Sequence, residues 1–365
     1  MYKKESSITS RNLNFEFLRI ISMLFIVAHH YSLYSHNEIT DPFHFSNLFL
    51  DFLKVGGKYG VILFILITGY FSIDKKYERK RVLKTILHTE FYSYLFFFIM
   101  ILLKQEIHFQ ELRYSLFPIL FSSYWFISTY VILYLLIPYI NILVDKITKR
   151  DFKVLLIILS SFIVIFPSAL GVCFPIGNVL IFIYIYLLGA YLKIYRDSFT
   201  KKKSFYLFFS IFFYLGSYIT IIVLKGLSLK IPFLYGMEYF YISLNSIFFY
   251  PSAISLFLFF SKIEIDSSWK KTILSFSQTT LGVYLIHENY FVRIYLWTTL
   301  LKINPIENNV FFVLSSIGTI LMVYLTCSCI DYCYNLLFEK HILKLGNKVY
   351  TYFCSLFNKL LKEDL

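Results

Sequence analysis

The stretch RNLNFEFLRIISMLFIVAHHYSLYSH, residues 11 to 36, has the length and the apolar content of a membrane-spanning helix. It also carries Arg19, His29 and His30 among leucine, isoleucine, phenylalanine and valine. Ionisable side chains inside a bilayer are costly, and they usually face a protein interior or a water-filled cavity in which they have a function. The stretch therefore predicts a membrane helix that contributes to a functional site.

The rest of the chain is similarly apolar. Its 365 residues are 58% hydrophobic and 21% aromatic, and only 16% are charged, which is more apolar material than a soluble core of this length can bury. Apolar runs of roughly 17 to 25 residues, long enough to cross a bilayer, recur about ten times. Their centres lie near Met23, Leu66, Phe97, Leu133, Ile158, Tyr184, Phe213, Ser246, Leu285 and Met322. The sequence predicts an all-α integral membrane protein, a bundle of about ten transmembrane helices.

The positive charge follows the breaks between these runs. A net charge of +13 could indicate a nucleic-acid partner, but the basic residues do not gather on one soluble face. With the N-terminus inside, about 26 of the 35 lysines and arginines fall in inside segments and only seven, Lys54 and Lys58 among them, in outside loops. This asymmetry predicts that both termini are cytoplasmic, that the basic runs contact membrane lipids, and that no nucleic acid is bound.

Short loops leave little room for a folded domain outside the membrane. We expect one transmembrane domain over residues 1–340 and a basic cytoplasmic C-terminal tail over residues 341–365. The longest outside connection, residues 32 to 56, holds polar side chains such as Asp51 that could contact a polar acceptor. The five cysteines lack the short C-x2-C spacing of a zinc site, so no metal is predicted.

Helical spacing groups the polar residues of the first helix. Arg19 and His30 are eleven positions apart, which places them within about 20° of one face and roughly 16 Å apart along the axis. Glu16 shares that face, whereas His29 lies about 80° away from it. In the alternative interpretation, Glu16 pairs with Arg19 at the inner interface and the histidines only cap the outer end.

A second polar group lies in TTLGVYLIHENYFVRIYLW, residues 279 to 297. Its members are Tyr284, His287, Glu288 and Arg293. This segment runs from inside to outside like the first helix, and His287 is expected at a depth similar to that of His30. A histidine can take a proton from a hydroxyl, and a carboxylate beside it can orient the ring or stabilise its charged form. The two segments could therefore converge on one buried chamber.

The first helix resembles that of the acyltransferase-3 family of membrane-bound acyltransferases, which transfer acyl groups, commonly acetyl, onto cell-surface carbohydrates. In FEFLRIISMLFIVAHH an acidic residue precedes an arginine, and a histidine follows after ten residues. The resemblance implies that Arg19 and His30 are the essential arginine and histidine of the family.

Four later segments extend the resemblance over essentially the whole chain. YGVILFILITGYF, residues 59 to 71, is similar to a second-helix signature that ends in Ser-Gly-Tyr, with Thr68 in place of serine. The basic loop after it resembles an R-x-x-R motif in which Lys84 replaces the second arginine and loses the bidentate fork. SSYWFISTYVILYLLIPYIN matches a Trp-Phe and later proline pattern, and LGVYLIHEN matches a late Tyr-Leu-x-His helix. Their order and spacing are more specific than any one of them.

The resemblance implies an O-acyltransferase of a bacterial plasma membrane. Acetyl-CoA or another acyl-CoA would be the co-substrate, with no tightly bound cofactor, and a capsular, exopolysaccharide or lipid-linked glycan would be the acceptor. His30 would act as general base or transient acyl carrier, and His287 and Glu288 would orient it or stabilise charge. The expected donor-binding residues are Glu16, Arg19, Thr68, Tyr70, Arg79, Arg81 and Lys84, and the expected acceptor-binding residues are Trp125, Tyr284, Arg293 and Trp297.

A proton-coupled transporter or flippase of an anionic or glycan solute is the main alternative. Buried arginines and histidines would then bind the solute and relay protons. This alternative does not explain the ordered set of acyltransferase-like segments. Strict dependence of ester formation on acyl-CoA separates the two.

Overall fold

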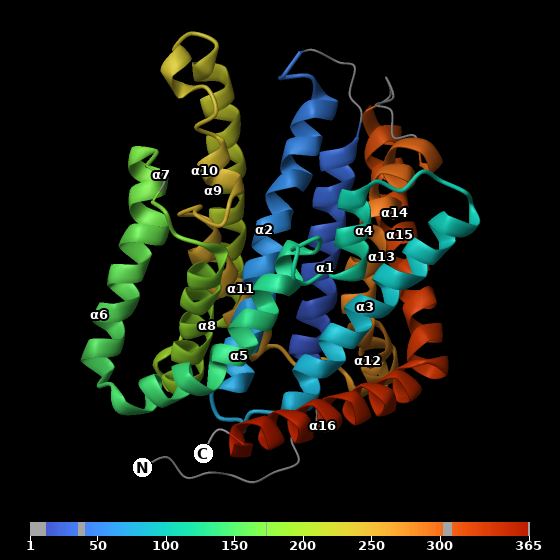
Figure 1. Cartoon of the computed structure of the whole chain (residues 1–365). Coiled ribbons are helices and arrows are strands. Elements are labelled where there is room, and N and C mark those ends of the chain that lie inside the picture. The colour runs from blue at the N-terminus through green and yellow to red at the C-terminus, as the bar shows by residue number, and fades with distance from the viewer. Residues whose placement is uncertain (1–11, 36–40, 173, 302–308, 364–365) are drawn as a thin grey trace.

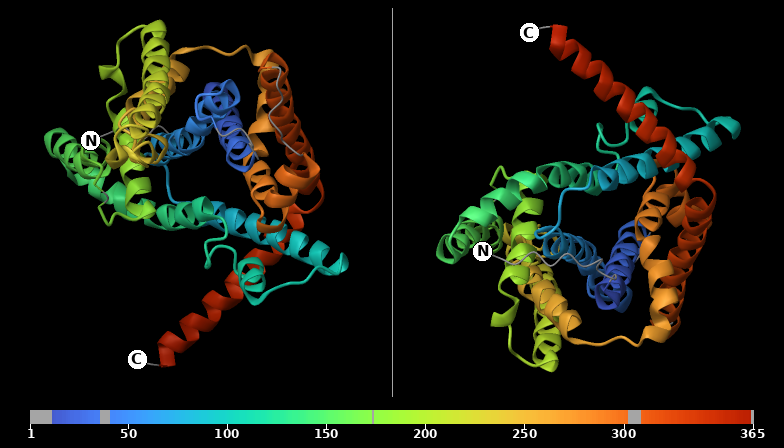
Figure 2. Two further views of the ribbon diagram at one scale, coloured as in Figure 1. Left: turned by 90° about the horizontal axis from the view of Figure 1, so that it is seen from above. Right: turned by 90° about the horizontal axis from the view of Figure 1, so that it is seen from below.

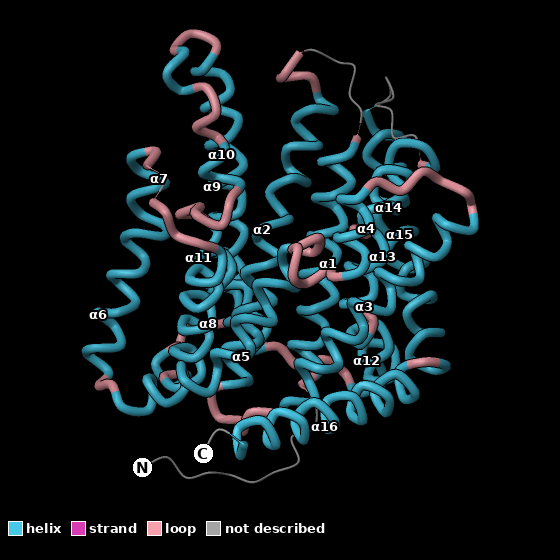
Figure 3. Tube along the Cα trace, viewed as in Figure 1, coloured by secondary structure: helices cyan, strands magenta, loops and turns pink. Residues whose placement is uncertain are grey.

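The computed structural model describes residues 12–35, 41–172, 174–301 and 309–363, and within these ranges the chain forms helices, turns and loops but no strand (Figure 3). The protein is therefore all-α, as predicted. The basic residues Lys3, Lys4 and Arg11, which support the predicted topology, lie outside the described residues.

Two long helices form the centre of the bundle. Helices α1 (Leu13–Tyr34) and α2 (Phe45–Ser72) pack along each other and are enclosed by the other helices (Figure 2). Glycine allows their close approach, because a Cβ atom on Gly60 would lie 2.5 Å from the carbonyl oxygen of Ser22. A Cβ atom on Gly57 would likewise overlap the ring of His29. The polar residues of α1 are thereby held against α2.

One side of this pair is covered by the middle of the chain. The helices here are α6 (Lys149–Ser160), α7 (Phe166–Leu170), α8 (Asn178–Ile194), α9 (Lys203–Ser228), α10 (Tyr239–Ile242) and α11 (Phe249–Lys262). α8 packs tightly on α2, since a Cβ atom on Gly69 would overlap the backbone of Tyr186. α6 and α7 lie farthest from the centre (Figure 1).

The other side holds α3, α4 and the C-terminal part of the chain, and α5 (Trp125–Lys146) joins the two sides because it contacts both α8 and α3. The helices of this other side are α3 (Arg79–Leu102), α4 (Phe109–Leu116), α12 (Lys270–Gln278), α13 (Thr280–His287), α14 (Tyr290–Ile294) and α15 (Asn309–Leu337). α1 contacts α12, α13 and α15, so segments far apart in sequence meet at its polar face. The last helix, α16 (Glu339–Glu363), crosses the end of the bundle at which α1 begins; we call this the α16 end (Figure 1).

Six helical segments are long and apolar enough to cross a membrane within the described residues. They are Leu13–Tyr34, Arg79–Leu102, Trp125–Lys146, Lys149–Leu170, Lys203–Ser228 and Val310–Leu337. Together they identify a multi-pass membrane protein. The number of ten crossings and the cytoplasmic position of both termini stay predictions.

Of the four remaining expected spans, those centred on Leu66 and Tyr184 are single helices, α2 and α8, and the other two are interrupted. The run centred on Ser246 is not one helix, because α10 ends at Ile242 and α11 begins at Phe249. The run centred on Leu285 is broken between α13 and α14. Irregular backbone at membrane depth is tolerated where protein buries it or where it lines a cavity. Apolar content alone does not reveal such breaks.

The prediction of a long outside connection over residues 32 to 56 was wrong. α1 continues to Tyr34 and α2 begins at Phe45, so Asp51 is a helical residue. Its carboxylate is buried and pairs with Lys225 of α9, and Lys54 lies 3.8 Å from it. In the sequence, charged residues at these positions suggest an exposed loop. In the structure, Lys225 of another helix compensates the charge of Asp51 inside the bundle.

The predicted tail forms one helix that is attached to α3. Lys84 Nζ lies 2.7 Å from the carboxylate of Glu339, and Arg79 donates a hydrogen bond to the Tyr350 hydroxyl over 2.9 Å. The helix then extends beyond the bundle (Figure 2). The domain boundary at residue 340 stays a prediction.

Candidate active site

Three of the predicted residues meet between α1 and α13. His30 Nδ1 lies 2.9 Å from His287 Nε2, and His30 Nε2 lies 2.7 Å from a carboxylate oxygen of Glu288. His287 is fully buried, and the His30 and Glu288 side chains are 12% and 8% exposed. The structure thus brings together one residue of the first helix and two that follow more than 250 positions later.

The break after α13 presents Glu288 to His30. α13 ends at His287, and the Asn289 side chain accepts a hydrogen bond from the backbone of Phe291 and so caps α14. Asn289 also donates to the hydroxyl of Tyr124 over 2.7 Å, and that hydroxyl donates to the Leu285 carbonyl over 3.0 Å. These bonds satisfy backbone and side-chain groups that an interrupted helix leaves open.

Glu288 has partners that stabilise its ionised form. The Tyr34 hydroxyl donates to Oε1 over 2.9 Å, and Arg293 Nη1 lies 3.5 Å from the same oxygen. A carboxylate favours its charged form when donors and cations surround it. The second oxygen, Oε2, is left to face His30.

The contacts of the two imidazole rings differ. A carbonyl oxygen can only accept, so His287 Nδ1 donates to Val283, 2.5 Å away. In the neutral ring His287 Nε2 is then an acceptor, and it faces His30 Nδ1 at 2.9 Å. His30 Nε2 faces Glu288 Oε2. The two nitrogens of the His30 ring thus contact an imidazole on one side and a carboxylate on the other.

The same three residues could be considered as metal ligands. One atom from each lies within 4.8 Å of the others. His30 contacts His287 through one ring nitrogen and Glu288 through the other, so in the present arrangement the three side chains form a chain of polar contacts. The expectation that the site holds no metal stays a prediction.

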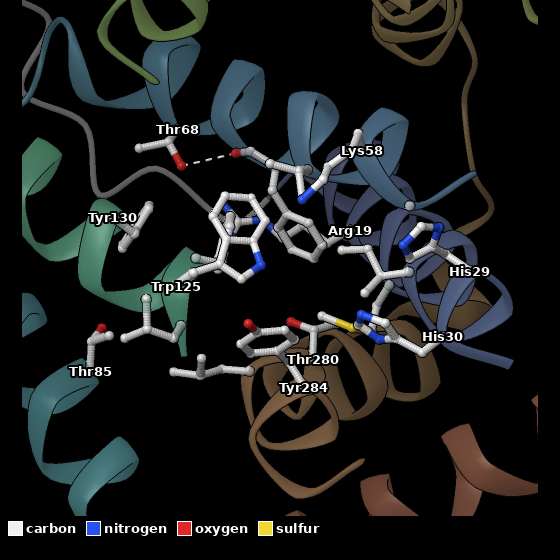
Figure 4. A pocket seen from close by; sticks show the side chains of 18 residues that line it. Arg19, His29, His30, Lys58, Thr68, Thr85, Trp125, Tyr130, Thr280 and Tyr284 are labelled. Atoms are coloured by element: carbon white, nitrogen blue, oxygen red, sulfur yellow. Dashed lines mark hydrogen bonds between the residues drawn. The ribbon is translucent and has the colours of Figure 1, made fainter. Parts of the chain in front are cut away.

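A cavity of about 220 Å³ lies beside His30 (Figure 4). Five predicted site residues line it: Arg19, His30, Thr68, Trp125 and Tyr284. Among the lining residues that were not assigned from the sequence, five carry polar groups: His29, Lys58, Thr85, Tyr130 and Thr280. Its lining thus combines cations, hydroxyls and aromatic rings.

Arg19 marks the part of the cavity farther from His30 along α1. Its Nε is buried and has no hydrogen-bond partner among the described residues. Such a donor is costly unless a ligand satisfies it. No ion pair between Glu16 and Arg19 is found there either, so the alternative in which these two side chains pair is not what the structure shows. Arg19 is available to a ligand with acceptor oxygens.

The comparison with known families agrees with this geometry. A family model described as an acyltransferase domain matches residues 12–328, nearly the whole chain. The chain belongs to the acyltransferase-3 family. No significant match was found among curated proteins or among solved structures. The family supports a membrane acyltransferase in general terms.

The basic residues expected to bind the donor lie outside the cavity of this acyltransferase-3 protein. Arg79, Arg81 and Lys84 are at the start of α3, near the α16 end. Arg81 contacts Glu78 at 2.8 Å, and Lys84 contacts Glu339. In this arrangement they can meet only the part of a donor that remains outside the bundle. Their role stays a prediction.

Four other expected residues also lie away from the cavity. Tyr70 packs against Phe15 and Phe257, and Glu16 is not among the lining residues. Trp297 is fully buried with its ring 6.3 Å from that of His287, and Arg293, which contacts Glu288, is not among the lining residues. Trp297 and Arg293 thus pack beside the histidines and the carboxylate, and their role toward an acceptor stays a prediction.

The sequence contained partial indications of the unassigned residues. His29 was placed off the Arg19 face, but the cavity is wide enough to include it, and its Nδ1 contacts the Lys54 carbonyl oxygen at 2.7 Å. Lys58 was assigned to an outside loop, yet it lies within α2. Tyr34 had no motif, and only the fold reveals its bond to Glu288.

Proposed function

We propose that this protein transfers an acyl group, acetyl in the simplest case, from cytoplasmic acyl-CoA to a hydroxyl of a cell-surface or exported carbohydrate. The plasma membrane of a bacterium is the proposed location. The observation that carries the proposal is the Glu288–His30 contact at 2.7 Å beside a cavity lined with cations and aromatic rings. A carboxylate that orients a histidine is a recurrent arrangement for acid–base chemistry on a hydroxyl.

His30 is the proposed general base. In the reactive form its proton is on Nε2, opposite the Glu288 carboxylate, and Nδ1 carries the lone pair that accepts a proton. The acceptor hydroxyl then takes the place of His287 at Nδ1. As the hydroxyl oxygen attacks the thioester carbonyl carbon, its proton moves to Nδ1, and Glu288 stabilises the imidazolium that forms.

Collapse of the tetrahedral intermediate completes the transfer. The carbon–sulfur bond breaks, the ester carbonyl re-forms, and the CoA thiolate takes the proton from His30. The ester and CoA leave, and no oxidant, reductant or metal is needed. The histidines return to their initial protonation state, so each turnover uses one acyl-CoA and one hydroxyl.

The cavity lining suggests how the substrates are held. Arg19 offers an unpaired donor to the amide and carbonyl oxygens of the pantetheine arm. The basic start of α3 would meet the phosphates outside the bundle, at the α16 end. Tyr130 and Tyr284 offer aromatic faces to a sugar ring, whereas one face of Trp125 is covered by Lys58. The donor and the acceptor would thus approach His30 from different sides.

A labelled-acetyl assay tests the function. Membranes with wild-type protein are given labelled acetyl-CoA and a range of glycans, and base-labile label on carbohydrate is measured. We expect transfer by the wild type and none by His30→Ala at equal protein level. His341→Ala, an exposed histidine of α16, is the matched control and should remain active. Wild-type rates in His30→Ala would refute the role of His30, and the absence of label from any acyl-CoA would favour transport of an anionic solute.

A further inference from the structure

Lys58 of α2 is a cation in the cavity without a carboxylate partner. Its ammonium lies 3.7 Å from the centre of the Trp125 ring. No carboxylate oxygen lies within 4.0 Å of it in the described part of the chain, whereas Lys54, one helical turn away, is 3.8 Å from Asp51. The same helix therefore holds one lysine compensated by an acid and one that is not.

The cavity as a whole has an excess of basic groups. Its ionisable lining residues other than tyrosine are Arg19, His29, His30 and Lys58, and no aspartate or glutamate is among the lining residues that the structure describes. An uncompensated ammonium at membrane depth is costly. Such a charge is expected where a negative group is bound or develops during a reaction.

Lys58 lies at the same depth in the bundle as His29 and His30, not at the depth of Arg19. A Cβ atom on the neighbouring Gly57 would overlap the His29 ring, and the Lys54 carbonyl, one turn earlier, contacts His29 Nδ1. The rings of His29 and His30 are 5.3 Å apart. Figure 4 shows the Lys58 amine pointing into the cavity between Trp125 and the histidines. The amine thus faces the volume in which His30 would meet the thioester.

We propose that the Lys58 ammonium is the group that stabilises the oxyanion of the tetrahedral intermediate. When the hydroxyl oxygen bonds to the thioester carbon, the carbonyl π electrons move to the carbonyl oxygen, which becomes negative and faces Lys58. The proton of the hydroxyl goes to His30, and the charge returns from the oxygen as the carbon–sulfur bond breaks. This inference rests on the proposed function, since it requires an acyl transfer.

Trp125 suits this role because it holds the ammonium without neutralising it. A cation–π contact orients a lysine by the ring quadrupole and leaves its full charge for a second partner. A carboxylate at the same place would cancel the charge before the oxyanion forms. In a site with little water, a preoriented charge contributes more to transition-state stability than it would in solution.

Kinetics of Lys58→Met test the proposal. Removal of one oxyanion donor lowers kcat by about 10²- to 10³-fold in other acyl-transfer enzymes. We expect a loss of this size in kcat, with the KM for acetyl-CoA changed by less than about threefold, because the interaction exists only in the transition state. Lys54→Met is the matched control from the same helix and should retain most activity.

Two further measurements make the result decisive. Lys58→Arg keeps the cation and should restore part of the rate, which also guards against a folding defect in Lys58→Met. The loss should be equal for acetyl-CoA and succinyl-CoA, and for neutral and acidic glycans. A loss confined to succinyl-CoA or to acidic glycans would instead make Lys58 a carboxylate-binding residue and would overturn the proposal.

The two proposals fail in different ways. If the wild type transfers no acyl group, the proposed function fails. If the wild type transfers and Lys58→Met does so at a similar kcat, or with only a raised KM, the function stands and the oxyanion role of Lys58 is refuted.

Discussion

Two buried histidine–carboxylate pairs occur in the described part of the bundle, and they differ in what surrounds them. His30 and Glu288 are 2.7 Å apart, as are His88 of α3 and Asp331 of α15. The first pair adjoins a cavity and a broken helix, whereas the residues of the second pair do not line the cavity and lie on continuous helices. The contact distance therefore does not distinguish a reactive pair from a structural one.

The carboxylate of the second pair is saturated by neighbours. Asp331 is fully buried and also accepts hydrogen bonds from Tyr92 at 2.9 Å and Asn335 at 3.1 Å. The His88 ring stacks on Tyr334 with centroids 4.4 Å apart, and its Nδ1 is buried without a hydrogen-bond partner among the described residues. A Cβ atom on Gly282 would overlap the Asp331 carboxylate, so α13 packs directly on it. Such a network joins α3, α13 and α15, and none of its residues lines the cavity.

The difference shows what makes a buried polar pair available for chemistry. At His30 the second ring nitrogen is bonded to another histidine, a partner that a hydroxyl can replace. At Asp331 both oxygens are engaged by groups that a substrate cannot displace without separating helices. We therefore interpret the first pair as catalytic and the second as a packing element.

Glu288→Gln should give the largest effect on the reactive pair. The amide keeps the size of the side chain but cannot stabilise the imidazolium, so kcat should fall by about 10²- to 10⁴-fold, the usual contribution of general acid–base catalysis. Thermal stability in detergent should change little. Glu106→Gln, an exposed loop substitution, serves as the control. Unchanged kcat in Glu288→Gln would remove the distinction between the two pairs.

Asp331→Asn should give the corresponding effect on the structural pair. Loss of one partner from a buried charged pair costs about 3–5 kcal/mol of stability. We expect a lower thermal unfolding temperature in detergent, with transfer per folded molecule close to that of the wild type. A variant of normal stability that has lost transfer would show that Asp331 takes part in the reaction.

Tyr34→Phe should give the smallest effect. It removes one hydrogen bond to Glu288, and a single bond contributes about 0.5–1.5 kcal/mol, so kcat should fall by about two- to tenfold. Tyr31→Phe is the matched control. Tyr31 lies about one turn before Tyr34 on α1, and its hydroxyl is hydrogen-bonded to Ser316 and not to Glu288. An equal loss in both variants would point to general loosening of α1 rather than to support of Glu288.

The reactive pair and some of the residues near it could be predicted from the sequence, because these residues interrupt apolar runs. Arg19, His30, His287 and Glu288 stand out for that reason, and helical spacing with the family resemblance predicted that they converge. Asp331 also interrupts an apolar run, but nothing in the sequence indicates that His88 and Tyr92 saturate it. Partners from distant helices decide the role of such a residue.

Other features could not be predicted because they depend on packing. Lys58 resembled a loop residue until α2 was seen to extend from Phe45 to Ser72. Trp297 was expected to contact a sugar, but it is buried behind His287. The breaks at Ser246 and after His287 contain polar residues such as Asn245 and Asn289, but a prediction based on apolar content alone does not identify them as helix ends. Tertiary contacts such as those of Asn289 hold these breaks in place.

A paired transfer assay tests the central claim most directly. Labelled acetyl transfer from acetyl-CoA to glycan is measured for His30→Gln and for His88→Gln, each normalised to the amount of folded protein. The account predicts that His30→Gln has lost transfer and that His88→Gln, though less stable, transfers at a rate close to that of the wild type. Transfer that survives in His30→Gln, or that is lost equally in both variants, would contradict it.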